Sequence, residues 1–122
     1  MDITVIDQIF SLCQVRDLSQ IDYTGEYCFV GKTDDEISLI CAAQSAPANA
    51  LTCDTGWRAM KIRGVWDFTQ IGVLAKISAR LAQNSIAVLA VSTYNTDYIF
   101  TKAEHFEKAA ALVREIPLKP TV

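Results

Sequence analysis

Histidine, proline and glycine are scarce in this sequence, and paired metal-binding motifs are missing. The 122 residues include one histidine, three prolines and five glycines. The four cysteines stand 15, 13 and 12 residues apart without a CxxC pair, so the closely spaced ligands of a zinc site are lacking. About half of the residues are hydrophobic, which argues against disorder. We expect one ordinary domain, or two very small units that share a core.

Clustered positive charge is also missing. The net charge is −3 and the pI is near 5.0, whereas nucleic-acid binding needs grouped lysines and arginines. The only local group is Arg58, Lys61 and Arg63, beside an expected strand, where a solvated edge is the favoured interpretation. We expect no nucleic-acid partner.

Long apolar runs are absent too. No stretch approaches the ~20 apolar residues of a membrane span. The first residues, Met1 to Thr4, lack the basic and then apolar layout of a signal peptide. These features predict a cytoplasmic protein with no membrane partner. In a reducing cytosol, the four cysteines should be free and mostly buried thiols.

The second half of the chain predicts the order β-α-β-β-α. A helix should begin at Asp67 as N-cap, with Gln70 in the capping-box position, and end at a left-handed Asn84. Apolar residues at helical spacing give this helix one buried face. The remaining elements are a strand over 57–63, a strand over 86–91, a returning strand over 98–100 and a helix over 103–116.

The first half repeats this order in reduced form. Strands are expected over 10–15, 27–30 and 37–42, with room for about one helical turn over 17–21. The chain start, 3–6, can add an edge strand to either half. Residues 29–37 align with 91–99 as strand, turn and strand, which indicates an internal duplication. We predict an N-terminal unit over 1–56 and a C-terminal unit over 57–122.

A βαββα plan of this size is the ferredoxin-like plan. The stretches Trp57-Arg58-Ala59, Trp66 to Leu74 and Val91 to Ile99 resemble small bacterial ACT-domain proteins. They are also similar to the ACT repeats of CASTOR-type arginine sensors, which carry a comparable Ser-Thr-aromatic-x-x-Asp stretch. The resemblance implies an α+β fold of tandem ACT-like βαββα units with antiparallel sheets and a degenerate first unit.

The resemblance also implies a function without catalysis. ACT domains typically bind amino acids at interfaces between units, and they use the loop from the first strand into the first helix. The partners implied are a small-molecule amino acid ligand, a second copy of the chain in a homodimer and a regulated protein. No cofactor, metal or catalytic residue is expected. Carried over, the ligand-binding positions are Asp67, Thr69, Ile71, Gly72 and Val73 in the loop and Thr93, Tyr94, Thr96 and Asp97 in the hairpin.

The same residues allow purely structural interpretations. Gly72 would lie one turn inside the expected helix, at a cost of about 1 kcal/mol relative to alanine. Either a ligand carboxylate or a closely packed neighbour could explain it. Asp67 could act only as N-cap, Asp97 could cap the turn through its own backbone, and Tyr94 could line a pocket or an interface.

Two other functions compete with ligand binding. One is a structural dimerisation or adaptor module whose pocket is vestigial. The other is an enzyme that pairs a cysteine with His105, or uses the acidic turn Asp34-Asp35-Glu36 as an acid/base pair or metal site. The cysteines lie in apolar strands and His105 on a distant helix, so catalysis is disfavoured. A solvated turn is the favoured interpretation of the three carboxylates.

Overall fold

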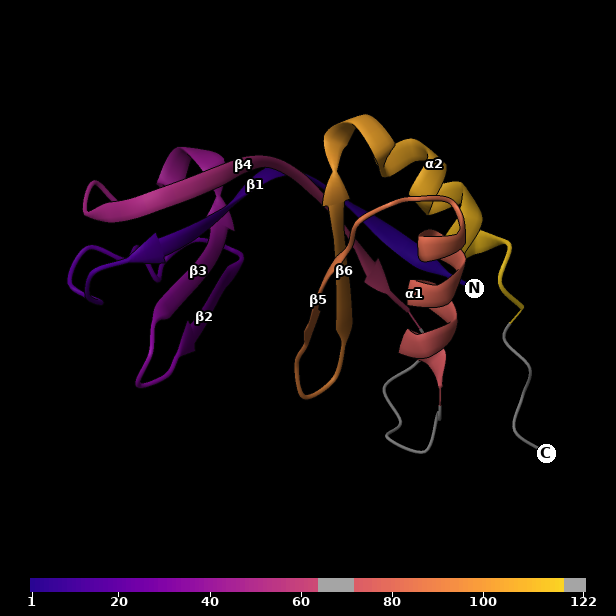
Figure 1. The fold of residues 1–122 in the computed structure, drawn as a ribbon, viewed down its shortest axis with the longest axis horizontal. Coiled ribbons are helices and arrows are strands. Elements are labelled where there is room, and N and C mark those ends of the chain that lie inside the picture. The colour runs from indigo at the N-terminus through magenta and orange to yellow at the C-terminus, as the bar shows by residue number, and fades with distance from the viewer. Residues whose placement is uncertain (64–71, 118–122) are drawn as a thin grey trace. The chain divides into compact units, whose positions relative to one another are not determined.

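The computed structural model describes residues 1–63 and 72–117 (Figure 1). The chain divides into two compact units. Gln8–Trp57 form the N-terminal unit, and Met1–Asp7 together with Arg58–Val122 form the C-terminal unit. The hydrogen-bonded strand order is β2-β3-β1-β4-β6-β5. The fold is α+β with antiparallel strand pairs, as the sequence predicted.

Two long strands each contribute residues to both units. β1 spans Ile3–Val15 and β4 spans Ala50–Ile62. The sequence predicted two separate strands where β1 is continuous, and it placed the start of β4 at Trp57. The sequence missed the first half of β4 because its residues show no apolar pattern. This half of the strand is exposed and is held by backbone pairing.

The C-terminal unit has the predicted order β-α-β-β-α. After β4 come α1 (Val73–Gln83), β5 (Leu89–Ser92), β6 (Asp97–Lys102) and α2 (Ala103–Arg114). The N-terminal edge strand, whose unit the sequence left open, belongs here as the first residues of β1. The Arg63 backbone N–H donates a hydrogen bond of 2.9 Å to the Asp2 carbonyl.

The core of the C-terminal unit lies between its strands and both helices, which lie side by side (Figure 1). Alanines 109 and 110 of α2 are buried and let this helix approach its neighbours closely. The Arg58 guanidinium lies 4.6 Å from the centroid of the buried Phe106 ring, a cation–π contact. The buried members of this core are Met60, Ile62, Val73, Ile77, Leu81, Ile86, Ile99, Phe106, Ala109, Ala110, Val113 and Ile116.

Helix α1 ends one residue later than predicted. Ser85, not Asn84, takes the left-handed conformation, with φ of 59°. The Ile86 N–H donates to the Leu81 carbonyl and the Ser85 N–H to the Ala82 carbonyl, both at 3.0 Å, which is a Schellman motif. The Asn84 side chain donates to the Arg80 carbonyl at 3.0 Å. Because this motif uses residues 85 and 86, β5 begins later than the predicted strand.

The N-terminal unit contains β2 (Cys28–Lys32), β3 (Ile37–Ala42) and a single 3₁₀ turn, η1 (Ala43–Ser45), besides its parts of β1 and β4. Residues 17–21, where the sequence left room for about one helical turn, form a single turn in which the Ile21 N–H donates to the Leu18 carbonyl at 3.3 Å. Asp17 Oδ1 accepts from the Ser19 N–H at 3.0 Å. One small buried cluster of this unit consists of Cys13, Val15, Ile21, Leu39 and Cys41, and Phe10 of the same unit is also fully buried.

Burial perturbs the thiols of this core. The pKa of Cys13 is raised from 9.0 to about 12. Burial is the largest cause of this rise, and contact with Cys53 is the next. Burial also raises the pKa values of Cys28 and Cys41. All four cysteines are free thiols, as predicted, with Cys13 and Cys41 buried and Cys53 exposed.

Truncating Leu81 should test the core of the C-terminal unit. Leu81 is fully buried in α1, so Leu81→Ala should lower the free energy of unfolding by about 2–5 kcal/mol. Leu74→Ala is the matched control, because Leu74 lies on the same helix but is only partly buried. Urea unfolding measures both. Equal losses would contradict this assignment of the core.

Alkaline pH should destabilise the folded chain through Cys13. Its folded pKa lies above its unfolded pKa, so its contribution to stability is complete below pH ~9 and is lost as pH rises toward ~12. The free energy of unfolding, measured by urea unfolding under a phosphine reductant, should therefore fall less steeply with pH in Cys13→Ala than in the wild type. Parallel pH profiles would show that this thiol is not buried in solution.

Candidate functional site

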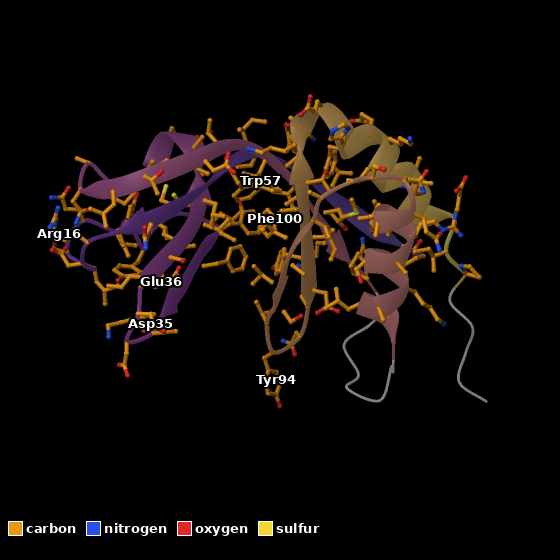
Figure 2. All side chains as sticks on the ribbon, in the orientation of Figure 1. Arg16, Asp35, Glu36, Trp57, Tyr94 and Phe100 are labelled. Atoms are coloured by element: carbon orange, nitrogen blue, oxygen red, sulfur yellow. The ribbon has the colours of Figure 1, made fainter. Side chains whose placement is uncertain are left out.

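The β5–β6 turn carries the predicted hairpin residues. The Thr93 backbone N–H donates to the Thr96 carbonyl at 2.8 Å, and the Thr93 hydroxyl donates to the same oxygen at 3.1 Å. Ser92, the last residue of β5, pairs with Asp97, the first residue of β6. Tyr94 is 81% exposed and lies at the tip of the turn (Figure 2). The turn therefore presents an aromatic ring to solvent, with half-buried Asp97 at its base.

The predicted loop residues are only partly described. Asp67, Thr69 and Ile71 lie outside the described residues, so their roles stay predictions. Gly72 and Val73 form the start of α1, at the same end of the C-terminal unit as the β5–β6 turn (Figure 1). The structure therefore brings part of the predicted set to one end of this unit.

The sequence predicted that Gly72 lies one turn inside the helix. In the structure it is instead the N-cap residue of α1. Its φ of 82° and ψ of 7° are left-handed, and its carbonyl accepts the first helical hydrogen bond, from the Lys76 N–H at 2.9 Å. Asp67, the predicted N-cap, lies outside the described residues. A Cβ at Gly72 would meet no described heavy atom within 4 Å. Among the described residues, backbone conformation explains this glycine and close packing does not.

The β2–β3 turn has the same hydrogen-bond pattern as the β5–β6 turn. The Thr33 N–H donates to the Glu36 carbonyl at 3.0 Å, and the Thr33 hydroxyl donates to it at 3.4 Å. Lys32, the last residue of β2, pairs with Ile37, the first residue of β3. The exposed carboxylates of this turn agree with the predicted solvated turn.

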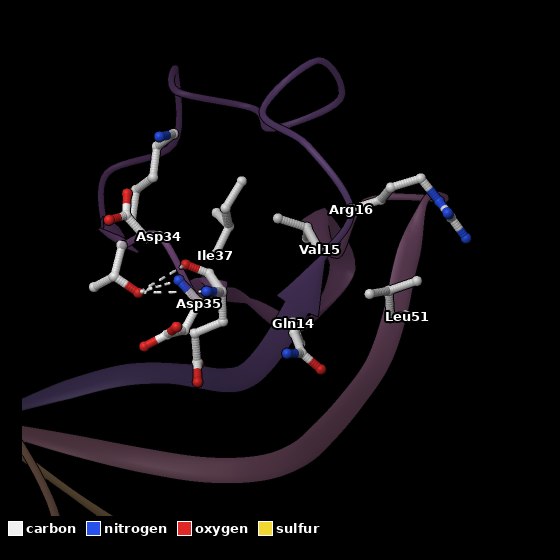
Figure 3. Close-up of a pocket in the computed structure, with 10 residues that line it drawn as sticks. Gln14, Val15, Arg16, Asp34, Asp35, Ile37 and Leu51 are labelled. Carbon is white, nitrogen blue, oxygen red and sulfur yellow. Dashed lines mark hydrogen bonds between the residues drawn. The ribbon is translucent and has the colours of Figure 1, made fainter.

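This turn also borders a cavity of about 320 Å³ that lies wholly within the N-terminal unit (Figure 3). Asp34 and Asp35 lie at one end, Arg16 lies at the other, and apolar side chains fill the middle (Figure 3). The lining consists of Gln14, Val15, Arg16, Lys32, Thr33, Asp34, Asp35, Glu36, Ile37 and Leu51.

The sequence did not predict this cavity. Its floor combines Val15 from the end of β1 with Leu51 from the start of β4, and only the fold brings them together. At one side, Asp17 Oδ1 accepts from Asn49 Nδ2 at 3.1 Å. Hydrogen bonds from Ser19, above all from its hydroxyl, hold the pKa of Asp17 below its usual range. The predicted alignment of residues 29–37 with 91–99 set Thr33 against Asn95, but the hydrogen bonds make Thr33 equivalent to Thr93, so that alignment was two residues out of register.

The acidic and histidine side chains do not gather into a metal-binding group in the described part of the chain. Residues 1–63 and 72–117 contain no group of three or more His, Cys, Asp or Glu side chains placed to hold a metal ion. His105 is exposed, as predicted, and its Nε2 lies 3.9 Å from the Glu104 carboxylate.

Residues 52–115, more than half of the chain, match the family model of the ACT domain. The chain belongs to the ACT domain family. No curated protein matches it significantly.

Solved structures share the fold over most of the chain. Protein Atu0741 from Agobacterium tumefaciens has a TM-score of 0.79 at 23% identity, over 92% of this chain and 85% of that one. Protein VC0802 of unknown function from Vibrio cholerae has a TM-score of 0.72 at 14% identity, over 91% and 85%. The regulatory subunit of aspartate kinase from Thermus thermophilus has a TM-score of 0.64 at 12% identity, over 93% and 95%.

These relationships define the fold class of the chain. The ACT match and the likeness to aspartate kinase regulatory domains agree with the predicted α+β, ferredoxin-like fold. Neither described helix is long and apolar enough to cross a membrane.

Replacing Gly72 should measure its left-handed strain. Gly72→Ala should lower the free energy of unfolding by about 1–2 kcal/mol, because a Cβ disfavours positive φ. Gly72→Asn should cost less, since asparagine tolerates this conformation. Chemical denaturation compares the two variants. A neutral Gly72→Ala would show that Gly72 is not left-handed in solution.

Proposed function

We propose that the chain is a non-catalytic regulatory protein of the cytoplasm that binds an amino acid or a similarly small metabolite. The observation that carries this proposal is the ACT-domain match over residues 52–115. Regulatory subunits of aspartate kinase with the same fold support it. The duplicated turn geometry supports two ACT-like units in tandem, as in the CASTOR-type repeats, with a degenerate first unit.

The proposed ligand site is the end of the C-terminal unit that carries the start of α1 and the β5–β6 turn. Gly72 gives this helix no side-chain cap, so its first backbone N–H groups and its dipole favour a carboxylate. The Asp97 carboxylate can pair with the ligand's amino group. Asp67, Thr69, Ile71, Val73, Thr93, Tyr94 and Thr96 complete the proposed site.

Binding would regulate by changing association. A ligand held at a unit or subunit interface stabilises the arrangement that it contacts best, and so shifts the equilibrium toward it. We therefore propose a homodimer and a regulated protein partner. A structural dimerisation or adaptor module without a ligand is the alternative.

Thermal unfolding against the twenty amino acids at millimolar concentration tests the proposal. A ligand at 100 times its Kd adds about 2.7 kcal/mol, which is a rise in Tm of roughly 10 °C for a chain of this size. Asp97→Asn should abolish the shift because it removes the charge with little change of shape. Asp35→Asn, the same change in the β2–β3 turn, is the matched control and should keep the shift.

Each other outcome has a distinct meaning. A shift lost only in Asp35→Asn would contradict the proposed site and place the ligand in the cavity of the N-terminal unit. A flat panel for the wild type would contradict amino acid binding and favour the structural module.

A further inference from the structure

The four cysteines of the chain form a row across the N-terminal unit. Neighbouring strands β2, β3, β1 and β4 each supply one of them. Cys28 on β2 and Cys41 on β3 are direct register partners. Cys13 lies on β1 and Cys53 on β4, two strands that are distant in sequence.

The thiols of Cys13 and Cys53 are in direct contact, with 2.7 Å between their sulfur atoms. Two residues away on each strand, the Ser11 hydroxyl donates to Thr55 Oγ1 at 2.9 Å. From the first pair to the second, the residue number falls by two on β1 and rises by two on β4. The two strands are therefore antiparallel here, the two residues of each pair lie opposite each other, and both pairs lie on one face of the sheet. Directly opposite residues in such a pair have Cα separations within the range that a disulfide needs.

The two thiols differ in access to solvent. Cys53 is exposed, whereas Cys13 is only 1% exposed and belongs to the core of the unit. A dissolved oxidant therefore reaches Cys53 first. Cys13 lies beneath it, in the position of a resolving thiol.

We propose that Cys53 and Cys13 form an oxidation site for hydroperoxides. A hydroperoxide transfers one oxygen atom to the Cys53 thiol, which becomes a sulfenic acid while the peroxide leaves as an alcohol or water. The Cys13 sulfur then attacks the Cys53 sulfur and the disulfide forms. The Cys13 proton and the sulfenic hydroxyl leave as water, so one peroxide oxidises two thiols.

The surroundings of Cys13 make it a poor first target for a peroxide. Burial, followed by contact with Cys53 and Cys41, raises the pKa of Cys13 to about 12, so this residue is a thiol at neutral pH and reacts poorly with peroxide by itself. Its reaction depends on a partner that is held in contact. A disulfide here would tie β1 to β4, and it would close the 39-residue segment between Cys13 and Cys53.

The test uses the full-length, reduced wild-type chain and hydrogen peroxide. After oxidation, free thiols are alkylated and peptides are mapped without reduction by mass spectrometry. We expect a Cys13–Cys53 crosslink with a loss of about 2 Da, the mass of two hydrogens. Cys28 and Cys41 should carry the alkyl label, and adding a thiol reductant should restore all four labels.

Variants separate the two roles. In Cys13→Ala, Cys53 should stop at the sulfenic acid, which a dimedone probe traps, and should then over-oxidise. In Cys53→Ser, Cys13 should stay reduced. Cys28→Ser is the matched control, because it removes another cysteine of the row and should leave the crosslink intact. Circular dichroism confirms that each variant is folded.

Three results would overturn the proposal. They are a Cys28–Cys41 crosslink in place of Cys13–Cys53, disulfides only between chains, and over-oxidation of Cys53 at equal rates in the wild type and in Cys13→Ala. The wild-type crosslink decides the question even if Cys13→Ala fails to fold.

Discussion

The pairing of two long strands, β1 and β4, is the constraint on which both units depend. A strand edge presents unpaired N–H and C=O groups, and leaving them unsatisfied costs free energy. The C-terminal unit takes residues Met1–Asp7 from the start of the chain, and the Arg63–Asp2 hydrogen bond closes this contact. The N-terminal unit combines the rest of β1 with the beginning of β4.

The same pairing places the chemistry of the N-terminal unit. It brings Cys13 against Cys53, and it brings Val15 and Leu51 to one cavity. These residues are about 35 to 40 positions apart in sequence. A single strand register therefore produces both the contact between an exposed and a buried thiol and the cavity with charge of both signs.

The two units differ in how their sheets are covered. In the C-terminal unit, α1 and α2 bury a dozen side chains. In the N-terminal unit, one 3₁₀ turn stands where α2 stands in the other, and the core is smaller and includes two cysteines. The hairpins nevertheless keep the same threonine hydrogen bonds, because these depend on four local residues and not on helix packing.

Much of the C-terminal unit could be predicted from local patterns. Apolar spacing predicted α1 and α2, alternation predicted the second half of β4, and an apolar run followed by a polar turn predicted the β5–β6 hairpin. The errors lie at boundaries, where alternatives differ by little free energy: Ser85 rather than Asn84 takes the left-handed conformation that ends α1, and Gly72 lies at the start of this helix rather than one turn inside it. At both ends of the helix, several polar residues or glycines compete for the capping position. Tertiary packing selects which of them takes it.

The candidate sites show the same division. The hairpin residues Thr93 to Asp97 could be named from the sequence because a turn is local. The Cys13–Cys53 contact and the cavity beside Arg16 could not, since both need strands from separate parts of the chain. The sequence by itself determined the α+β class, the order of elements and the turns, which are set by neighbours along the chain. Only the tertiary structure decided which strands pair, because register and long-range hydrogen bonds depend on the whole sheet.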